Sequence, residues 1–171
     1  MSDENDFAEC VRYTKLNDEV KKNIQQIKTK MIRIKSDNIY QFLPSYAPKL
    51  CIDVNKQEKK TGEKMLVQCN QFADSQRFIV KQYKDAYTIQ PTHSKLYLGV
   101  NKADMKQNII QKAQFDENCL WDFVEEDQFV MIKLRYSDLF IDISGDVEVA
   151  GAALIAFEFT GKRNQKFYIT Q

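Results

Sequence analysis

The sequence predicts an all-β domain that is built from three related repeats and preceded by one amphipathic α-helix. Its apolar segments are short, rich in β-branched and aromatic residues, and separated by polar turns, which is typical of strands. One such segment returns three times along the chain in similar form. Hydrophobic residues make up 43% of the 171 residues and aromatic residues 12%, which is sufficient for the core of one domain.

The repeat is clearest in three segments that begin with leucine: LCIDV at 50–54, LYLGV at 96–100 and LFIDI at 139–143. An alternating apolar strand precedes each of them, at 40–44, 87–91 and 129–134. A third apolar segment follows at 64–68, 108–112 and 153–157, and a polar-aromatic segment closes each unit at 75–80, 118–124 and 164–170. Recurrence at a period of roughly 45 residues indicates an array of supersecondary units.

Three repeats of four strands predict a pseudo-threefold β-trefoil of about twelve short strands over residues 39–171. The repeats would span about 39–83, 84–127 and 128–171. Paired-helix repeats would need apolar residues at helical spacing, and three propeller blades are too few to close a ring. We expect the last aromatic residue of each repeat to fill the centre of the barrel: Phe78, Trp121 and Phe167.

Residues 1–38 lie outside the repeats and form a helical extension in this interpretation. Their apolar residues recur at intervals of three and four positions: Leu16, Val20, Ile24, Ile27, Met31 and Ile34. This spacing predicts an amphipathic helix with a narrow apolar seam. The helix could pack on the flank of its own trefoil or dock onto a protein partner. A free coiled coil of two heptads would be marginal, because helix nucleation is costly.

Charge and composition exclude several classes of function. The 25 basic and 24 acidic residues leave a net charge of +1, which argues against a nucleic-acid partner. No apolar run is long enough for a membrane-spanning helix, and the acidic N-terminus lacks the apolar region of a signal peptide. The four cysteines form no CxxC motif, so we expect free thiols, no metal site and an intracellular, cytoplasmic protein.

The sequence also offers little from which an enzyme could be built. Its one histidine, His93, lies in a turn-like stretch without a neighbouring nucleophile, and we expect it to be a solvated loop residue. No glycine-rich phosphate loop is present. We therefore expect no catalytic residues and no cofactor.

The motif that carries functional information runs from Leu-x-(Ile/Leu)-Asp-Val through a glycine and an apolar strand to Gln-x-(aromatic). It resembles the QxW repeat of ricin B-chain type lectins, and the resemblance covers about residues 39–171. It implies a carbohydrate-binding β-trefoil. In that family a repeat can form a shallow sugar site from an aspartate after the second strand, an aromatic residue ending the third strand, and an Asn-Gln pair.

The third repeat carries every element of this site: Asp142, Phe157, Asn164 and Gln165. A carboxylate can accept hydrogen bonds from neighbouring sugar hydroxyls, an aromatic ring offers a flat apolar surface, and an amide both donates and accepts. We expect Asp142 to point out of the core toward ligand hydroxyls. The other interpretation is that Asp142 only bonds backbone amides or the Gln165 amide and so holds the loop.

The other two repeats depart from the pattern. The first keeps Asp53 and Gln76 but has Gln68 at the aromatic position, which predicts a weak second site. The second has Gly99 in place of the aspartate, Gln111 at the aromatic position and Cys119 in place of the glutamine, so no site is expected.

The family resemblance also raises the question of a disulfide between Cys51 and Cys69. Cys69 lies one position early for that pairing, and a slip of one residue turns a strand side chain to the opposite face. Whether the two pair stays open at this stage.

Two functions from different classes remain. The first is a non-enzymatic, lectin-like module with one competent site in the third repeat and a weakly bound glycan as partner. The second is a structural or interaction β-trefoil, a subunit of a larger intracellular assembly that docks through the helix at 16–34 and keeps vestigial sugar sites.

Overall fold

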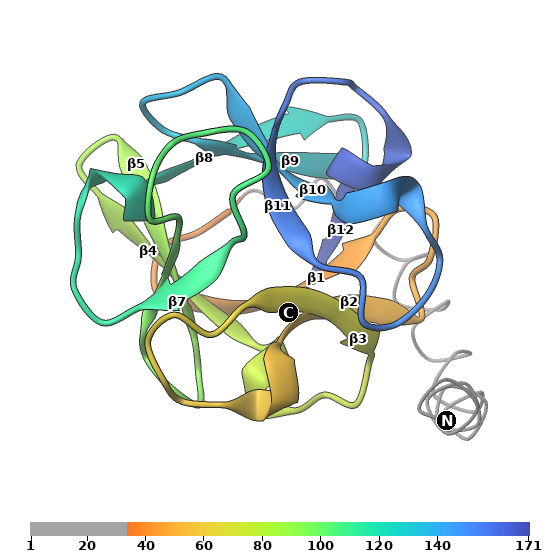
Figure 1. Ribbon diagram of the computed structural model, residues 1–171, viewed down its shortest axis with the longest axis horizontal. Coiled ribbons are helices and arrows are strands. Elements are labelled where there is room, and N and C mark those ends of the chain that lie inside the picture. Colours follow the sequence, from red (N-terminus) through yellow and green to blue (C-terminus); the bar gives the residue numbers. More distant parts are fainter. Residues whose placement is uncertain (1–33) are drawn as a thin grey trace.

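A computed structural model describes residues 34–171, which form an all-β structure (Figure 1). The strands are β1 (Asn38–Pro44), β2 (Leu50–Val54), β3 (Met65–Cys69), β4 (Phe78–Tyr83), β5 (Ala86–Pro91), β6 (Tyr97–Gly99), β7 (Ile110–Lys112), β8 (Trp121–Glu126), β9 (Phe129–Leu134), β10 (Leu139–Ile143), β11 (Leu154–Glu158) and β12 (Phe167–Thr170). Short 3-10 helices occupy Asn55–Gln57, Asp74–Gln76, Glu117–Cys119, Ser144–Asp146 and Arg163–Gln165. The prediction of twelve short strands is confirmed.

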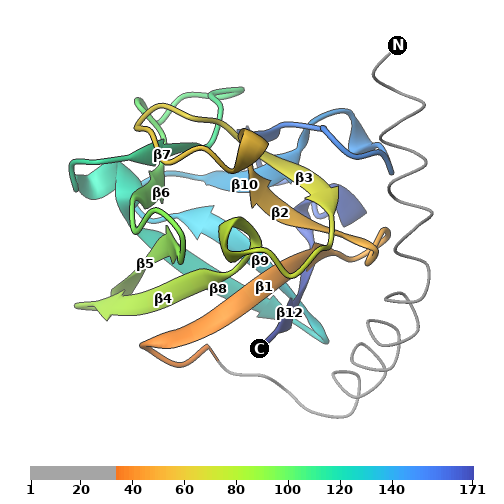
Figure 2. The same cartoon turned by 90° about the horizontal axis from the view of Figure 1, so that it is seen from below.

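Six strands close into a barrel. Each pairs with its neighbour in the ring β1, β4, β5, β8, β9, β12, and β12 returns to β1. The remaining strands form three antiparallel hairpins, β2–β3, β6–β7 and β10–β11, which surround the axis in Figure 1 and lie together at one end of the barrel in Figure 2. Isolated bridges such as Leu66 to Ala153 join one hairpin to the next. This arrangement is a β-trefoil.

The alternation of side chains along β10 shows how the sequence forms both core and surface. Successive residues of a strand point to opposite faces. Ile141 and Ile143 are fully buried in the main core, whereas Phe140 and Asp142 face the other way. β11 pairs in a register that sets Asp142 opposite Ile155.

The barrel interior is filled by the large aromatic residues expected there. Phe78, Trp121 and Phe167 have no exposed surface, and the Trp121 Nε1–H donates to the Leu98 carbonyl at 3.0 Å. A buried indole N–H without an acceptor would be costly, so this bond fixes the ring orientation. The prediction that these three residues form the core is confirmed.

The predicted helix lies mostly outside the described residues, because Leu16, Val20, Ile24, Ile27 and Met31 precede residue 34. Its last member, Ile34, is described and is not helical. Ile34 is partly buried against the core of the trefoil, and the docking of the other five residues onto a partner stays a prediction. No helix among residues 34–171 is long and apolar enough to cross a membrane.

The cysteines only partly match the expectation. Cys51 and Cys119 are buried free thiols, and therefore Cys51 does not pair with Cys69. Cys69 itself is disulfide-bonded, so the prediction of a free thiol is wrong at that position. The thiol of Cys51 faces the Gln68 carbonyl, and burial raises its pKa well above the ordinary value.

Candidate functional site

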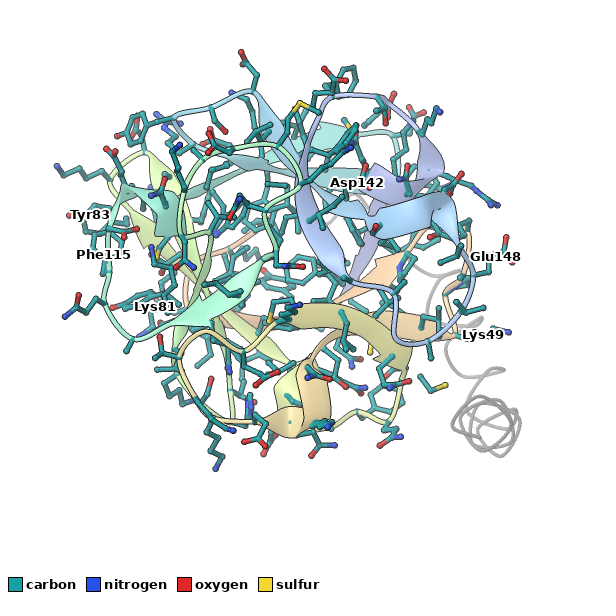
Figure 3. The ribbon with its side chains drawn as sticks, viewed as in Figure 1. Lys49, Lys81, Tyr83, Phe115, Asp142 and Glu148 are labelled. Atoms are coloured by element: carbon teal, nitrogen blue, oxygen red, sulfur yellow. The ribbon has the colours of Figure 1, made fainter. Side chains whose placement is uncertain are left out.

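The third repeat contains an open hollow of about 510 Å³, beside the hairpin β10–β11. Asp142, Phe157 and Asn164 line this hollow, so three of the four predicted site residues are brought together. The strand register explains the first two, because Asp142 pairs with Ile155, and Phe157 lies two residues further along the same face. Phe157 remains partly exposed. Figure 3 shows Asp142 within the third repeat and Glu148 at its edge.

Two amides hold the carboxylate of Asp142. The Asn164 Nδ2 donates to Oδ1 at 2.9 Å, and the Gln165 Nε2 donates to Oδ2 at 2.9 Å. Both amides come from the 3-10 helix Arg163–Gln165, which immediately precedes β12. Asp142 is only 4% exposed. The two interpretations of Asp142 therefore combine, since it faces away from the core and also ties the loop to β10.

Gln165 is itself fixed at every polar atom. Its Nε2 also donates to the Glu158 carbonyl at 2.8 Å, and its Oε1 accepts from the Thr160 backbone N–H at 2.9 Å. Gln165 has no exposed surface. It positions Asp142 and does not contact the hollow, which assigns it a supporting role.

Burial controls the acidity of Asp142. Removal from solvent raises the pKa of this carboxyl from 3.8 to about 6, the Gln165 hydrogen bond opposes the rise, and the negative charge of Asp146 adds to it. At neutral pH the group is ionised and can accept hydrogen bonds.

Asn164 has an acceptor that nothing in the protein uses. Its Nδ2 bonds Asp142 and also the Ile143 carbonyl at 3.2 Å, and the side chain is 7% exposed. The Oδ1 atom is buried and has no hydrogen-bond partner among residues 34–171. A buried polar atom without a partner is unfavourable, so Asn164 Oδ1 can accept a hydrogen bond from a water or a ligand that reaches it from the hollow.

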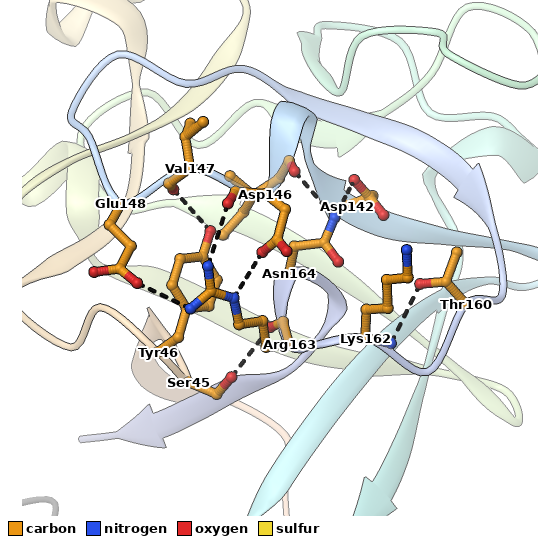
Figure 4. A network of polar contacts seen from close by, with 11 residues as sticks. Ser45, Tyr46, Asp142, Asp146, Val147, Glu148, Thr160, Lys162, Arg163 and Asn164 are labelled. Carbon is orange, nitrogen blue, oxygen red and sulfur yellow. Dashed lines mark hydrogen bonds and ion pairs between the residues drawn. The ribbon is translucent and has the colours of Figure 1, made fainter.

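The loop at 144–149 is clamped beside this position. The guanidinium of Arg163 bonds Asp146 Oδ1 at 3.0 Å and Glu148 Oε1 at 2.9 Å (Figure 4). Its Cζ lies 4.4 Å from the centre of the Tyr46 ring, which is a cation–π contact. The Tyr46 hydroxyl donates to the Val147 carbonyl at 2.9 Å. Burial and the nearby Asp146 raise the pKa of Tyr46 to about 12, so the phenol stays protonated and keeps donating.

The first repeat forms the same hydrogen bond between a glutamine amide and the aspartate, but it has no asparagine beside that aspartate. Gln76 Nε2 donates to Asp53 Oδ2 at 2.9 Å, but Asp53 Oδ1 accepts from the Val54 backbone N–H at 2.7 Å. Ser75 replaces the asparagine here, and its buried Oγ likewise has no hydrogen-bond partner among the described residues. Gln68, at the aromatic position, accepts from the Cys69 backbone N–H. Asp53 and Gln76 meet, but Gln68 offers no apolar surface to a ligand.

His93, from the second repeat, contacts a loop of the first repeat and is not a solvated loop residue. It is partly buried, and its Nε2 lies 3.1 Å from the Glu58 carbonyl. The geometry matches that of Tyr46. Each residue stands two positions after the proline that ends β1 or β5, and each reaches the carbonyl five positions after the repeat's aspartate. Sequence reasoning missed both clamps, although the shared Pro-x-(Tyr/His) spacing was a signal.

In the second repeat a lysine occupies the position of the aromatic residue. β6 pairs with β7 so that Gly99 faces Ile110, which makes Lys112 the register equivalent of Phe157. The assignment of Gln111 to that position is wrong, because the hairpin loop is shorter than in the third repeat. Lys112 Nζ donates to the Val100 carbonyl at 3.1 Å and forms an ion pair with Asp116 at 2.5 Å.

Gly99 is required by this packing. A Cβ at this position would lie 2.6 Å from the Asn118 carbonyl oxygen and 3.0 Å from Cys119 Sγ. An aspartate could not occupy it without a backbone shift. The expectation that the second repeat lacks the site elements therefore agrees with its geometry. Among residues 34–171 no cluster of histidine, cysteine or acidic residues could hold a metal ion.

No family model and no curated protein matches the sequence of this chain. Solved structures do match its fold. The Rhizoctonia solani agglutinin superposes with a TM-score of 0.75 at 16% identity, over 83% of this chain and 99% of that one. The Macrolepiota procera ricin B-like lectin, solved in complex with lactose, gives 0.73 at 15% identity, over 82% and 99%. The designed threefold-symmetric protein ThreeFoil gives 0.74 at 21% identity, over 78% and 98%.

These similarities cover the trefoil and establish its fold. The predicted resemblance to the β-trefoil of ricin B-type lectins is confirmed at this level.

Proposed function

We propose that this protein is a non-enzymatic carbohydrate-binding module with one site, in the third repeat. The observation that carries the proposal is the buried, unpaired Asn164 Oδ1, which lies beside the ionised Asp142 in a hollow that Phe157 also lines. Sugar hydroxyls would donate to these oxygens. The apolar face of a pyranose would pack against the exposed part of the Phe157 ring.

The similar structures support this proposal without naming the ligand. A ricin B-like lectin of the same fold was solved with lactose bound, and its likeness covers 82% of this chain. A single open site of this kind should bind weakly. Millimolar affinity corresponds to about −4 kcal/mol, and clustered copies would be needed for useful avidity.

The experiment that tests the proposal is a glycan array probed with the purified 171-residue chain. The test variants are Asp142→Ala and Phe157→Ala. Asp53→Ala is a matched control, because Asp53 accepts the same hydrogen bond from a glutamine in a repeat without an open site. Thermal melting would verify that each variant is folded.

We expect binding to be lost in both third-repeat variants and retained in Asp53→Ala. Phe157 is partly exposed, so Phe157→Ala should fold even if removal of Asp142 destabilises the chain. A wild-type protein that stays silent on densely printed glycans would contradict the proposal.

The second candidate is a structural or interaction subunit with vestigial sugar sites. The observation that favours it is the sealed second repeat, where Lys112 fills the position of the aromatic platform. A rigid trefoil needs no open hollow to act as a scaffold. A silent array would favour this role, and binding that depends on Phe157 would argue against it.

A further inference from the structure

We propose that the third-repeat site selects sugars that carry an anionic group, such as a sulfate ester or a carboxylate. This inference rests on the proposed function and adds the chemical class of the ligand. Its basis is a pair of lysines, Lys106 and Lys162, which line the same hollow as Asp142 and Phe157 and have no ion-pair partner among the described residues.

Lys106 reaches the hollow from the second repeat. The segment 106–108 runs along the edge of β11 that β10 leaves free. The Lys106 backbone N–H donates to the Ala156 carbonyl at 2.7 Å, and Asn108 forms a bridge with Ile155. The backbone of Lys106 is therefore held on the flank of β11 that lies away from Asp142.

Lys162 enters from the opposite side. It directly precedes the 3-10 helix Arg163–Gln165, and its backbone N–H donates to the Thr160 Oγ1 at 3.3 Å. Figure 4 shows its side chain extending on the Asp142 side of this turn. Its positive charge is close enough to oppose the rise that burial causes in the pKa of Asp142.

The acidic groups around the hollow are already engaged. Asp146 lines it too, but the guanidinium of Arg163 bonds it at 3.0 Å. The two carboxylate oxygens of Asp142 accept from the amides of Asn164 and Gln165.

Some of the other described lysines have carboxylate partners and some, such as Lys95, do not. Lys102 pairs with Asp104 at 2.8 Å, on the same loop as Lys106, and Lys166 pairs with Glu126 at 2.6 Å. Lys106 and Lys162 differ from these lysines in that they line the hollow and form no ion pair with a described carboxylate, although the charge of Lys162 acts on Asp142.

A sugar acid would use all of these groups at once. Its hydroxyls would donate to Asp142 and Asn164, its apolar face would pack on Phe157, and its anionic group would lie between the lysines at the rim. An ammonium group binds an anion as a point charge. Carboxylates, sulfate esters and phosphate esters therefore share the chemistry that the two lysines recognise.

The test is an array on which each glycan is printed as a neutral form and as its sulfated, phosphorylated or carboxylated counterpart. The probe is the full chain. The variants are Lys106→Gln, Lys162→Gln and the double variant. Lys95→Gln is a matched control, because Lys95 is an exposed loop lysine of the second repeat with a positive φ of 60°, close to the 64° of Lys106, and it does not line the hollow.

We expect the anionic member of a pair to bind more strongly, with each lysine contributing about two- to fivefold. The preference should shrink in 0.5 M NaCl, which is roughly the range where screening suppresses exposed charge pairs. The double variant should bind both members equally. Lys95→Gln should keep the preference. The three anionic series distinguish sulfate, phosphate and carboxylate ligands.

Several results would overturn the inference. Equal binding within the pairs would remove the anionic preference and leave the sugar site intact. A preference that survives in the double lysine variant would place the charge recognition elsewhere. Anionic binding that persists in both Asp142→Ala and Phe157→Ala would reveal non-specific charge attraction. If no glycan of either kind binds, the proposed function fails first.

Discussion

At the residue scale, Asp142 is a buried carboxylate that also lines an open hollow. A buried carboxylate is unfavourable unless hydrogen bonds satisfy it. Asn164 and Gln165 each bond one of its oxygens, and each carboxylate oxygen has further acceptor capacity that a ligand can use. Burial nevertheless raises the pKa to about 6, so the charge of this residue changes near the physiological range.

This shift predicts pH-dependent sugar binding. The folded-state pKa of about 6 lies above the ordinary value of 3.8, so the carboxylate is ionised at pH 7 and becomes protonated as the pH falls through 6. A ligand that needs the ionised form should bind about tenfold more weakly at pH 5 than at pH 7. Titration with a neutral glycan identified on the array would measure this. Circular dichroism at both pH values would verify the fold, and equal affinity at pH 5 and 7 would exclude Asp142 as the acceptor.

At the element scale, the loops that frame the sites are held by residues from the next repeat around the ring. Tyr46 and His93 follow β1 and β5 and bond carbonyls of the third and first repeats, at sequence separations of 101 and 35 positions. The equivalent residue after β9 is Tyr136, which is 69% exposed. A contact from the neighbouring repeat to this loop is therefore present in the two repeats that retain an aspartate.

The clamp on the third repeat gives a second prediction. Arg163→Ala removes the bonds to Asp146 and Glu148 and the contact with Tyr46, so the amides of residues 144–149 should exchange hydrogen faster and sugar affinity should fall. Hydrogen exchange read by mass spectrometry measures the first effect. The melting temperature should change by only about 2 °C, because exposed ion pairs contribute little to global stability.

Arg77→Ala is a suitable control for that experiment. Arg77 is an arginine of similar exposure, paired with Asp74 at 3.5 Å just before β4 of the first repeat. It should leave exchange at 144–149 and sugar affinity unchanged. If Arg163→Ala behaves in the same way, the clamp does not control the site.

The strands could be predicted from the sequence because their signals are local. Alternating apolar residues identify β9 and β10 without any tertiary information. Register is harder. A one-residue slip exchanged Gln111 for Lys112 at the aromatic position, because the loop of that hairpin is shorter and sequence spacing does not show where the deletion lies. The lining of the hollow includes Lys106, which comes from another repeat, and no local pattern could place it there.

At the scale of the whole molecule, the threefold symmetry of the fold is not matched by the side chains at the proposed site. The barrel and its three hairpins repeat closely, but the side chains around the aspartate position of the second strand differ from one repeat to the next. In the third, Asn164 Oδ1 is unpaired beside Asp142. In the first, Ser75 Oγ and His93 Nδ1 are unpaired and Asp53 Oδ1 accepts from the Val54 backbone N–H. In the second, Lys112 occupies the aromatic position. These differences concern a few side chains on a common backbone, so the repeats can differ at the proposed site while they share one core.

The last prediction follows from this asymmetry, and it is one glycan per chain. In a nitrogen-15 labelled sample, titration with an array-positive sugar should shift amide signals of β10, β11 and the segment 144–165, together with Lys106, and fit a single site. Asp53→Ala should leave these shifts unchanged, whereas Asp142→Ala should abolish them.

Shifts of similar size around Asp53 and Gln76, or a fit that needs more than one site, would show that the first repeat also binds. With one weak site per chain, binding to a surface should depend strongly on density. Linking copies raises avidity by about 10² to 10⁴ without new contacts, provided that the geometry lets neighbouring copies bind together. Dense immobilisation of the same chain should therefore produce slow dissociation from a multivalent glycan, while a dilute surface should show only the rapid exchange of a single site.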